Sequence, residues 1–523
     1  MDVLIIAGIS KSSGSQFGVK QEIVKDGMVM NYVNLQKYFG VQPNDGFSNF
    51  STPYLAGIYL YNYLSRHGIN CGLINFLDIE MERFLNFLQQ SPKAIALSST
   101  FLIDIRSVKK VTQTIRQYAP DIKIILGGPL VYNSYLLYQM KDSDYDTASC
   151  TQDYFFLNTD EHYYKDIDLF VIEEQGEDTL HQVMEAIKNS RDYSGIPNLA
   201  YYKNNQIFFT IRKTEHTAFT EDLIQWEQIP DEYIYPIFPM RGSLGCPYRC
   251  RYCNFAPNRA FRLKSAEILG EEVAAIVKMG KVKIIRFTDD NLFLTRKHVE
   301  EYCRKIMEVG KGIRWSSLIR ANSISKENVK LIRDSGCIST MIGMESGNRN
   351  ILKEMNKEDT PEHYLEVVEL LNKHGISTQL TFLVGFPGET PQTIEDTINL
   401  INQFHFQGPA VNDVSIFPFG LAPLSPIYSP KNRKKYNLNG YMMNWSHDTM
   451  TSEEAKKYAG ELFLKLKHIH YHYGIAEFLM MDTEKLKKVS ELRSQIRRAE
   501  IMRYSSQNID QLWNQMKQLV VFG

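Results

Sequence analysis

Strand-like apolar runs alternate with helix-like runs along most of the chain, and this alternation constrains the fold more than any other feature of the sequence. Asp2–Ile9 (DVLIIAGI) is typical of a buried strand, and Asp104–Tyr118 has the apolar period of an amphipathic helix. Strands that are separated by helices form parallel sheets. The sequence therefore predicts an α/β protein, and 523 residues suffice for two to four domains at roughly 100–200 residues each.

The first 195 residues predict a doubly wound, Rossmann-like parallel sheet. The predicted strands are Asp2–Ile9, Asn70–Phe76, Ala94–Ser99, Lys123–Leu126 and Leu169–Ile172. Ligands of such sheets bind at the carboxyl ends of the strands, where small residues allow the backbone to approach closely. These ends carry Ser98, Ser99, Thr100, Gly127, Gly128, Gly176 and Glu177. We expect them to line a ligand site; the alternative is that they only end strands.

Two long stretches, Lys11–Ser51 and Tyr132–Asp166, interrupt this pattern without clear periodicity, and loops of this length are usually functional or disordered. Ile196–Thr210 carries Lys203-Asn204-Asn205 between two apolar runs and predicts a hairpin. We assign residues 196–237 to this hairpin and a linker.

A second series of alternating runs occupies residues 238–428 and predicts six βα repeats, two fewer than a closed TIM barrel. Its predicted strands are Phe238–Ser243, Lys283–Phe287, Arg314–Ile319, Ser339–Met344, Thr378–Val384 and Asp413–Phe417. The expected fold is a partial, TIM-like (β/α)6 barrel. Residues 429–523 predict an α-rich C-terminal domain that caps it or binds substrate, with helices near Ser452–Tyr473 and Asp482–Tyr504.

The amino-acid composition argues against several classes of protein. The 59 basic and 60 acidic residues give a net charge of −1, so no general field attracts nucleic acid or an anionic membrane. Apolar runs are too short for a membrane span and the N-terminus lacks a leader pattern, so we expect a cytoplasmic protein. Seven cysteines are too few for a disulfide framework.

Three of these cysteines, Cys246, Cys250 and Cys253, lie within eight residues, directly after the first strand of the second series. Thiolates on one short loop can converge on a soft metal centre, either zinc or an iron–sulfur cluster. Zinc requires a fourth ligand, and no His or Cys follows nearby. A [4Fe–4S] cluster with three thiolates leaves one iron for a ligand from outside the protein. The alternatives are a zinc knuckle or three unrelated thiols.

The run CPYRCRYC resembles the radical S-adenosylmethionine (SAM) signature, and the resemblance covers about residues 238–428. It implies that Cys246, Cys250 and Cys253 bind a [4Fe–4S] cluster, whose open iron holds SAM and whose electron cleaves SAM to a 5′-deoxyadenosyl radical. Further positions that match the family at successive strand ends are Asp290, Arg320, Glu345, Gly385 and Gly388.

Physical chemistry gives these residues possible roles. Glu345 is suited to the ammonium or ribose of SAM, or is a solvated acid. Arg320 is suited to the SAM carboxylate, or pairs with Asp290. Gly385 and Gly388 allow close passage of the backbone near an adenine, or form a tight turn. Lys357 matches the family only weakly, and we expect it on the surface.

With the barrel identified in this way, residues 1–195 resemble the cobalamin-binding domain that precedes the barrel in one large radical SAM subfamily. Many such domains contain DxHxxG, whose histidine ligates cobalt, but here the only histidines are His67, His162 and His181, none in that context. The resemblance then implies that cobalamin binds without a histidine ligand; the alternative is a scaffold that has lost the cofactor.

The expected function is C-methylation of an unactivated carbon in a natural product or peptide. It implies a small-molecule or peptide substrate and an external electron donor of the flavodoxin or ferredoxin type. The alternatives are a non-methylating cyclisation or rearrangement with the same architecture, and a corrinoid or Fe–S sensor without turnover. Because no cysteine follows Cys337, we expect one cluster. His468 and His472, four residues apart, are interpreted as a polar helix face.

Overall fold

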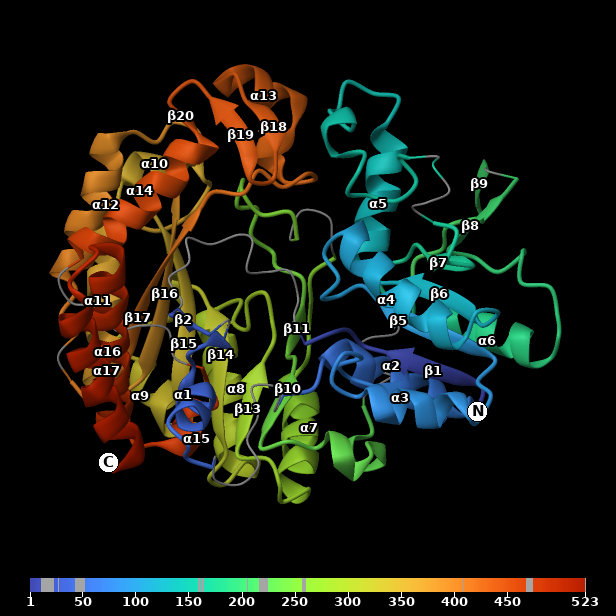
Figure 1. Cartoon of the computed structure of the whole chain (residues 1–523), viewed down its shortest axis with the longest axis horizontal. Coiled ribbons are helices and arrows are strands. Elements are labelled where there is room, and N and C mark those ends of the chain that lie inside the picture. Colours follow the sequence, from blue (N-terminus) through green and yellow to red (C-terminus); the bar gives the residue numbers. More distant parts are fainter. Residues whose placement is uncertain are drawn as a thin grey trace. The chain divides into compact units, whose positions relative to one another are not determined.

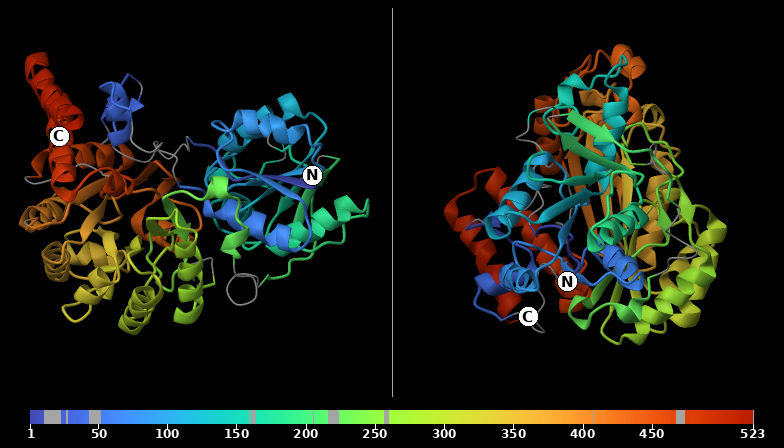
Figure 2. Two further views of the ribbon diagram at one scale, coloured as in Figure 1. Left: turned by 90° about the horizontal axis from the view of Figure 1, so that it is seen from below. Right: turned by 90° about the vertical axis from the view of Figure 1, so that its right-hand side faces the viewer.

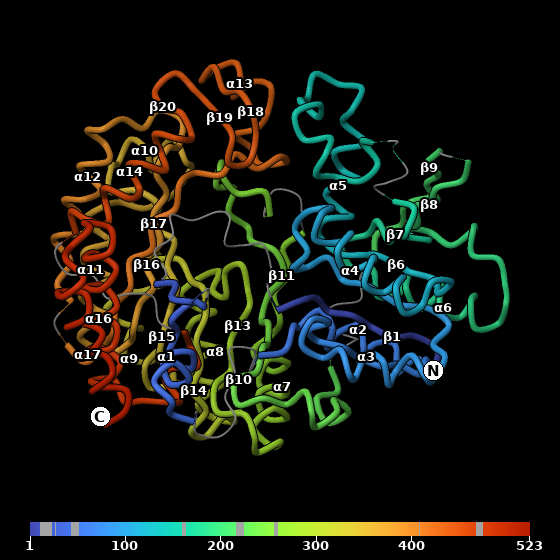
Figure 3. Tube along the Cα trace, in the orientation of Figure 1, coloured from blue at the N-terminus to red at the C-terminus, as the bar shows by residue number. Residues whose placement is uncertain are grey.

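The computed structural model describes residues 1–10, 23–26, 28–42, 52–158, 160, 164–204, 206–215, 224–255, 260–406, 408–466 and 474–522. The chain divides into two compact units. Unit 1 comprises residues 1–16 and 53–234, and unit 2 comprises residues 17–52 and 235–523. Figure 1 labels the helices and strands of both units, and Figure 3 follows the backbone trace. His162, His468 and His472 lie outside the described residues.

Unit 1 is built on a seven-stranded sheet of order β4-β1-β5-β6-β7-β8-β9. The first five strands in this order pair in parallel, and β8 and β9 extend the sheet as an antiparallel hairpin. The strands are β1 (Val3–Ile6), β4 (Cys71–Ile74), β5 (Ala94–Ser98), β6 (Lys123–Gly127), β7 (Leu169–Val171), β8 (Leu199–Lys203) and β9 (Gln206–Phe209). This confirms the predicted doubly wound parallel sheet, with the hairpin added to its edge.

The helices of this unit are α2 (Leu55–Arg66), α3 (Met81–Leu88), α4 (Ile105–Tyr118), α5 (Pro129–Met140) and α6 (Glu177–Lys188). Helix α5 falls largely within the stretch Tyr132–Asp166, which showed no clear period in the sequence. Its apolar and aromatic side chains are spread around the helix rather than gathered on one face, so periodicity did not reveal it. Gly128 at the N-cap and Pro129 at the first turn mark its start.

The units differ from the predicted domains at two places, because residues 17–52 belong to unit 2 and the predicted linker up to residue 234 belongs to unit 1. Within Lys11–Ser51 lies helix α1 (Tyr32–Tyr38), preceded by the short pair β2 (Val24–Lys25) and β3 (Met28–Val29), and this segment belongs to unit 2. Tyr32 and Leu35 of α1 are buried in a cluster with Trp513 and Met516 of α17 (Ser506–Val521). Contacts far apart in the sequence decide this placement, and local patterns do not encode them.

Unit 2 contains six parallel strands in the order β10-β13-β14-β15-β16-β17, as expected for a partial barrel. They are β10 (Ile237–Met240), β13 (Ile284–Phe287), β14 (Arg314–Ile319), β15 (Cys337–Glu345), β16 (Ser377–Val384) and β17 (Asn412–Pro418). Helices surround this sheet on its outer side (Figure 2). They include α7 (Ala266–Lys278), α8 (Arg296–Val309), α9 (Val329–Asp334), α10 (Arg349–Glu354), α11 (Pro361–Lys373) and α12 (Pro391–Gln403).

Beyond β17 the chain is α-rich, with a small three-stranded sheet that the sequence did not predict. Its elements are α13 (Pro430–Tyr436), β18 (Asn439–Tyr441), β19 (Asn444–His447), β20 (Met450–Thr451), α14 (Ser452–Lys465), α15 (Glu477–Met480), α16 (Thr483–Ile501) and α17. Residues in and before α15 pack on Ile237, Ile284 and Ile338 of the barrel strands. Among the described residues, no helix is long and apolar enough to cross a membrane.

Candidate functional site

The three clustered cysteines lie on the loop that follows β11 (Ser243–Leu244), as the signature predicts. Gly245 starts the loop with a φ of +67°, a conformation that favours glycine. Cys250 is buried, and Cys246 and Cys253 are half-buried. The backbone N–H of Cys253 donates to the carbonyl of Cys250 over 3.1 Å, which folds the loop into a tight turn.

Arg251, between two of the cysteines, ties this loop to the rest of unit 2. Its N–H donates to the carbonyl of Met355 (2.8 Å), its carbonyl accepts from the N–H of Ile427 (2.9 Å), and its guanidinium pairs with Glu354 at 3.0 Å. Backbone bonds on both sides hold the loop in one conformation. The position of the thiols is therefore defined by the fold and not by the loop alone.

Arg320 follows β14 and lies against the cysteine loop. Its Nη1 donates to the Sγ of Cys250 over 3.4 Å, and its guanidinium covers the ring of Tyr248 with 3.8 Å between its Cζ and the ring centroid. Its Nε and Nη2 are buried, with no hydrogen-bond partner among the described residues. The alternative ion pair between Arg320 and Asp290 is not formed in this part of the chain. A buried guanidinium with two unused donors is suited to a carboxylate ligand.

Glu345 is at the end of β15, where the register with β16 shifts and its φ is +70°. A residue with a side chain adopts this conformation only when the surroundings hold it. Its Oε1 accepts from the hydroxyl of Tyr252 (2.8 Å) and from the Nζ of Lys357 (3.3 Å). Glu345 is therefore not a solvated acid. It is buried and is linked to the cysteine loop through Tyr252.

Lys357 corrects a prediction, because it is buried beside Glu345 and not on the surface. The sequence signal was weak, since a lysine in a short run after a helix is usually exposed. Burial and the neighbouring charge of Glu345 raise the pKa of Tyr252 well above its usual value, so its hydroxyl remains a donor to that carboxylate.

Gly385 and Gly388 follow β16 with φ values of +98° and +96°. A Cβ on Gly385 would approach the Trp445 ring and Ala455 to 2.6 Å, whereas one on Gly388 would meet open space. The N–H of Gly385 donates to the carboxyl of Glu389 (2.6 Å), and its carbonyl contacts Nε2 of His447 at 3.0 Å. The Gly385 peptide is thus held from both sides, and the sequence did not predict these roles for Glu389 and His447.

The carboxyl group of Glu389 is buried, and no cation lies beside it among the described residues. Burial raises its pKa to about 8, although bonds from the Gly385 and Phe386 N–H groups oppose this shift. Burial also lowers the pKa of His447. The N–H of Thr449 donates to Nδ1 of His447 over 3.3 Å, so the ring proton resides on Nε2 and is donated to Gly385.

The loop after β13 contributes two acids. Asp289 is buried, and its carboxyl accepts from the N–H of Gly242 (2.9 Å) and from the hydroxyl of Ser243 (2.6 Å), so it fixes the strand end before the cysteines. Asp290 is exposed, and its charge acts on Cys246. Burial raises the pKa of the Cys246 thiol to about 11, against the lowering effect of Arg320.

Among the described residues, no three His, Cys, Asp or Glu side chains form a group with the geometry for a single metal ion. A cubane cluster takes each thiolate on a different iron, so its ligands lie farther apart than those of one ion. The donor set of three thiols on one loop, with a free buried guanidinium beside them, fits a [4Fe–4S] cluster and a ligand with a carboxylate.

In unit 1 the predicted site residues at β5 and β6 come together. Ser98 and Gly127 are register partners, and the hydroxyl of Ser99 donates to the carbonyl of Gly127 (2.7 Å) and accepts from the N–H of Leu130. The hydroxyls of Ser98 and Thr100 lie 3.0 Å apart. Gly128 has a φ of +98° and passes so close to Ser99 that a Cβ would lie 3.0 Å from its hydroxyl.

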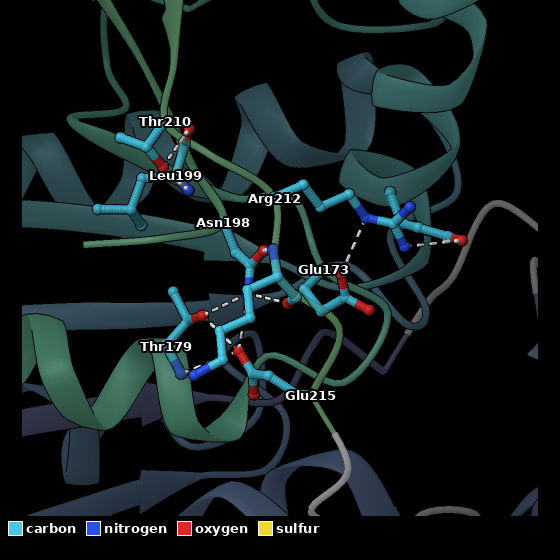
Figure 4. Close-up of polar contacts among 9 residues, drawn as sticks. Glu173, Thr179, Asn198, Leu199, Thr210, Arg212 and Glu215 are labelled. Atoms are coloured by element: carbon cyan, nitrogen blue, oxygen red, sulfur yellow. Dashed lines mark hydrogen bonds and ion pairs between the residues drawn. The ribbon is translucent and has the colours of Figure 1, made fainter. Parts of the chain in front are cut away.

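Gly176 and Glu177 precede and begin α6, but the N–H groups of this helix end are already in use. The carboxyl of Glu215 accepts from the N–H group of Asp178 (2.9 Å). It also accepts from the N–H group of Thr179 (3.1 Å) and from the Thr179 hydroxyl (Figure 4). Burial raises the pKa of Glu215 to about 7. Sequence reasoning missed Glu215, since it lies 37 positions from Asp178.

Comparison with known proteins identifies the family that the barrel resembles. Residues 240–401 match the Radical SAM superfamily. An uncharacterized methyltransferase of Pyrococcus horikoshii is 24% identical over 324 residues, which are 58% of this chain and 70% of that protein. The anaerobic magnesium-protoporphyrin IX monomethyl ester cyclase of Rubrivivax gelatinosus is 22% identical over 319 residues, 58% of this chain and 52% of the cyclase. The chain thus spans about half of the latter relative.

Among solved structures, the cobalamin-dependent SAM radical enzyme OxsB with aqua-cobalamin and SAM bound superposes with a TM-score of 0.58 at 14% identity. The match covers 99% of this chain and 79% of OxsB, so both units share its fold. This agrees with the expected cobalamin-domain-plus-barrel architecture. Residues 240–401 thus carry a radical SAM domain, and the two units together have the fold of a cobalamin-dependent SAM radical enzyme.

Proposed function

We propose that the protein binds a [4Fe–4S] cluster through Cys246, Cys250 and Cys253, binds SAM beside it, holds cobalamin in unit 1, and methylates an unactivated carbon of a small-molecule or peptide substrate. When bound, the cluster and corrin supply the electron for SAM cleavage and the carrier for the methyl group. The observation that carries this proposal is the buried Arg320, which touches a cluster thiol and retains two unused donors.

The residues around Arg320 have defined tasks in this proposal. Arg320 binds the carboxylate of SAM, and the carboxylate of Glu345 binds its ammonium group. Tyr252 and Lys357 hold Glu345 in its left-handed conformation. The backbone of Gly385, whose Cβ side is filled by Trp445 and Ala455, passes close to the adenine, and Glu389 and His447 fix its peptide plane.

In unit 1 the proposed cobalamin site is the edge formed by Ser98, Ser99, Thr100, Gly127 and Gly128, with Gly176 and Glu177 at the next strand end. Two features support it. Gly128 allows close passage of a ligand, and the side-chain oxygen of buried Gln175 has no hydrogen-bond partner among the described residues. His67, the C-cap of α2, and His181 of α6 pack with their ring centroids 5.0 Å apart, and neither belongs to the strand-end segments, which supports binding without a histidine ligand.

The second candidate is a non-methylating radical enzyme, which the resemblance to a cyclase supports. Two products of SAM separate the candidates without knowledge of the substrate. Methyl transfer from SAM to the corrin leaves S-adenosylhomocysteine, and reductive cleavage leaves 5′-deoxyadenosine. The protein is reconstituted anaerobically with iron, sulfide and cobalamin, reduced with a low-potential one-electron donor and supplied with SAM.

We expect both products. Formation of 5′-deoxyadenosine alone would favour the cyclase-like candidate, and the absence of both would leave a sensor. Cys250→Ala should lose the electron paramagnetic resonance signal of the reduced cluster and 5′-deoxyadenosine together. Cys303→Ala, at a buried cysteine of α8, is the matched control and should retain both.

A further inference from the structure

The barrel strands of unit 2 have an inner face that is distinct from their helix-covered face. Phe287 of β13 and Trp315 of β14 pack edge to face, and Nε1 of Trp315 donates to the carbonyl of Ser335 after α9, so both lie on the helix side. Because side chains alternate along a strand, Arg286 and Ser316 point to the opposite, inner face. They are register partners.

Arg286 forms no ion pair or hydrogen bond with the described residues, and it is the exception among three arginines on this inner face. Arg314 donates to the carbonyl of Phe478 (3.1 Å), and Arg320 donates to Cys250. No acidic or hydrogen-bonding partner of the Arg286 side chain exists among the described residues. Burial alone lowers its pKa, because neighbouring strands surround the guanidinium, yet the side chain remains accessible to solvent.

The strands beside Arg286 present hydroxyl groups at the same level. Through the sheet register, Arg286 is aligned with Ser316 of β14, then Ser339 of β15 and Ser377 of β16. Closed barrels fill such layers with bulky aliphatic side chains. Here one guanidinium and three serines occupy the layer, directly above the apolar floor around Ile284.

Arg286 lines the inner face with its side chain open to solvent and without a counter-charge from the described residues, so its charge is accessible to a ligand. We propose that Arg286 binds an oxyanion group of the substrate, a carboxylate or a phosphate ester, with the serine layer as auxiliary donors. This inference rests on the proposed function, and it names the class of substrate.

The position of Arg286 also indicates the shape of that substrate. Arg286 precedes Asp290, at the mouth of the barrel, by four residues, which corresponds to roughly 13 Å along an extended strand. The anionic group therefore enters first and lies deep in the barrel. The reacting carbon lies at the other end of the substrate, toward the cysteine loop.

The test uses the full-length reconstituted protein and 4-fluorobenzoate as an anionic probe, followed by fluorine NMR, with neutral 4-fluorobenzamide as its matched control. We expect benzoate to bind at least tenfold more weakly to Arg286→Gln than to the wild type, Arg286→Lys to recover part of the affinity, and the amide not to bind. Arg304→Gln, at an exposed position of α8, should bind like the wild type. Equal benzoate binding by the wild type and Arg286→Gln, including no binding by either, would overturn the inference.

Competition with inorganic phosphate distinguishes the two oxyanions: displacement of benzoate favours a phosphate ester, and retention favours a carboxylate. A second measurement addresses a structural role. Arg286→Met should leave the melting temperature within about two degrees of that of the wild type, because the side chain is accessible to solvent and bonds to no described residue. A fall of several degrees would show that Arg286 supports the fold instead.

The wild-type protein also separates this inference from the proposed function. If it binds benzoate through Arg286 but forms neither 5′-deoxyadenosine nor S-adenosylhomocysteine, the proposed function fails and the anion site stands. If it forms both products and Arg286→Gln binds benzoate normally, only the anion site fails.

Discussion

The strand ends of the two units offer ligands different kinds of contact. In unit 1, acidic side chains are satisfied within the chain: Glu215 accepts from the start of α6, and Glu173 pairs with Arg212 at 3.0 Å. In unit 2, Arg320 keeps two buried donors unused, and Arg286 has no partner among the described residues. Unit 1 is thus suited to a large ligand held by backbone and hydroxyl groups, and unit 2 to charged ligands held by guanidinium groups.

The largest expected effect tests the charged site. Arg320→Gln removes a cation and at least two charge-assisted hydrogen bonds, each worth about 1.5–3 kcal/mol. We expect the KM for SAM to rise about 100-fold. Arg314→Gln changes the same residue type on the same face, but Arg314 bonds to the Phe478 carbonyl and should leave this KM within about twofold of the wild type. A comparable rise in both variants would contradict the assignment of Arg320.

The same variant provides a measurement that does not depend on turnover. Donation by Arg320 to the Cys250 thiolate stabilises the more negative, reduced state of a cluster. Arg320→Gln should therefore lower the reduction potential of the cluster in a titration followed by electron paramagnetic resonance. An unchanged potential would mean that the contact with Cys250 has no electronic role.

The next prediction tests the proposed cobalamin site of unit 1, where backbone and hydroxyl groups line the strand ends. Gly128 has a φ of +98° and lies beside Ser99, so Gly128→Ala introduces backbone strain of roughly 1–2 kcal/mol and a Cβ on the proposed cobalamin side. We expect about tenfold weaker retention of cobalamin, read from the visible spectrum after gel filtration. Gly195→Ala, whose Cβ would meet open space, is the control. Equal retention by both variants would argue that the ligand does not pass close to Gly128.

The smallest effect compares two buried carboxyls. The pKa of Glu389 is raised to about 8 and that of Glu215 to about 7, both from 4.5. A raised pKa means that the folded state binds the proton more tightly, so each acid contributes stability below about pH 4.5 that is lost as the pH rises through its folded pKa. In the wild type, ionisation of Glu389 should lower the free energy of unfolding by up to about 1.4 kcal/mol per pH unit between about pH 5 and 8. Glu389→Gln should abolish this decrease.

Glu215→Gln should remove the loss only up to about pH 7, because its folded pKa is lower. Urea titrations from pH 5 to 9 measure both. If the stability of either variant varied with pH as steeply as that of the wild type, the carboxyl that it replaces would be ionised throughout this range in the wild-type protein.

Much of the fold was predictable, because periodicity marks an element wherever one face is buried. The strand Arg314–Ile319 was predicted with the bounds that the structure shows, and the helix predicted over Asp104–Tyr118 begins one residue later, at Ile105. Helix α5 was missed because its apolar side chains surround it. Helix α1 was missed because its burial depends on α17, nearly five hundred residues later.

The candidate site was predictable only where residue type and spacing carry the chemistry. The three cysteines, Arg320 and Glu345 were found from the sequence, since few other functions require them at strand ends. The contacts of Lys357, Glu389, His447 and Glu215 were not predicted, because they depend on how the folded chain places their partners.

The sequence by itself determined the alternation of strands and helices and the presence of three thiols on one loop, because both depend only on residues that are neighbours in the sequence. Only the tertiary structure decided which charges remain without partners. Arg286, Arg314 and Arg320 are the same residue type on one sheet face, and their different roles depend on what the folded chain places within hydrogen-bond distance of each guanidinium.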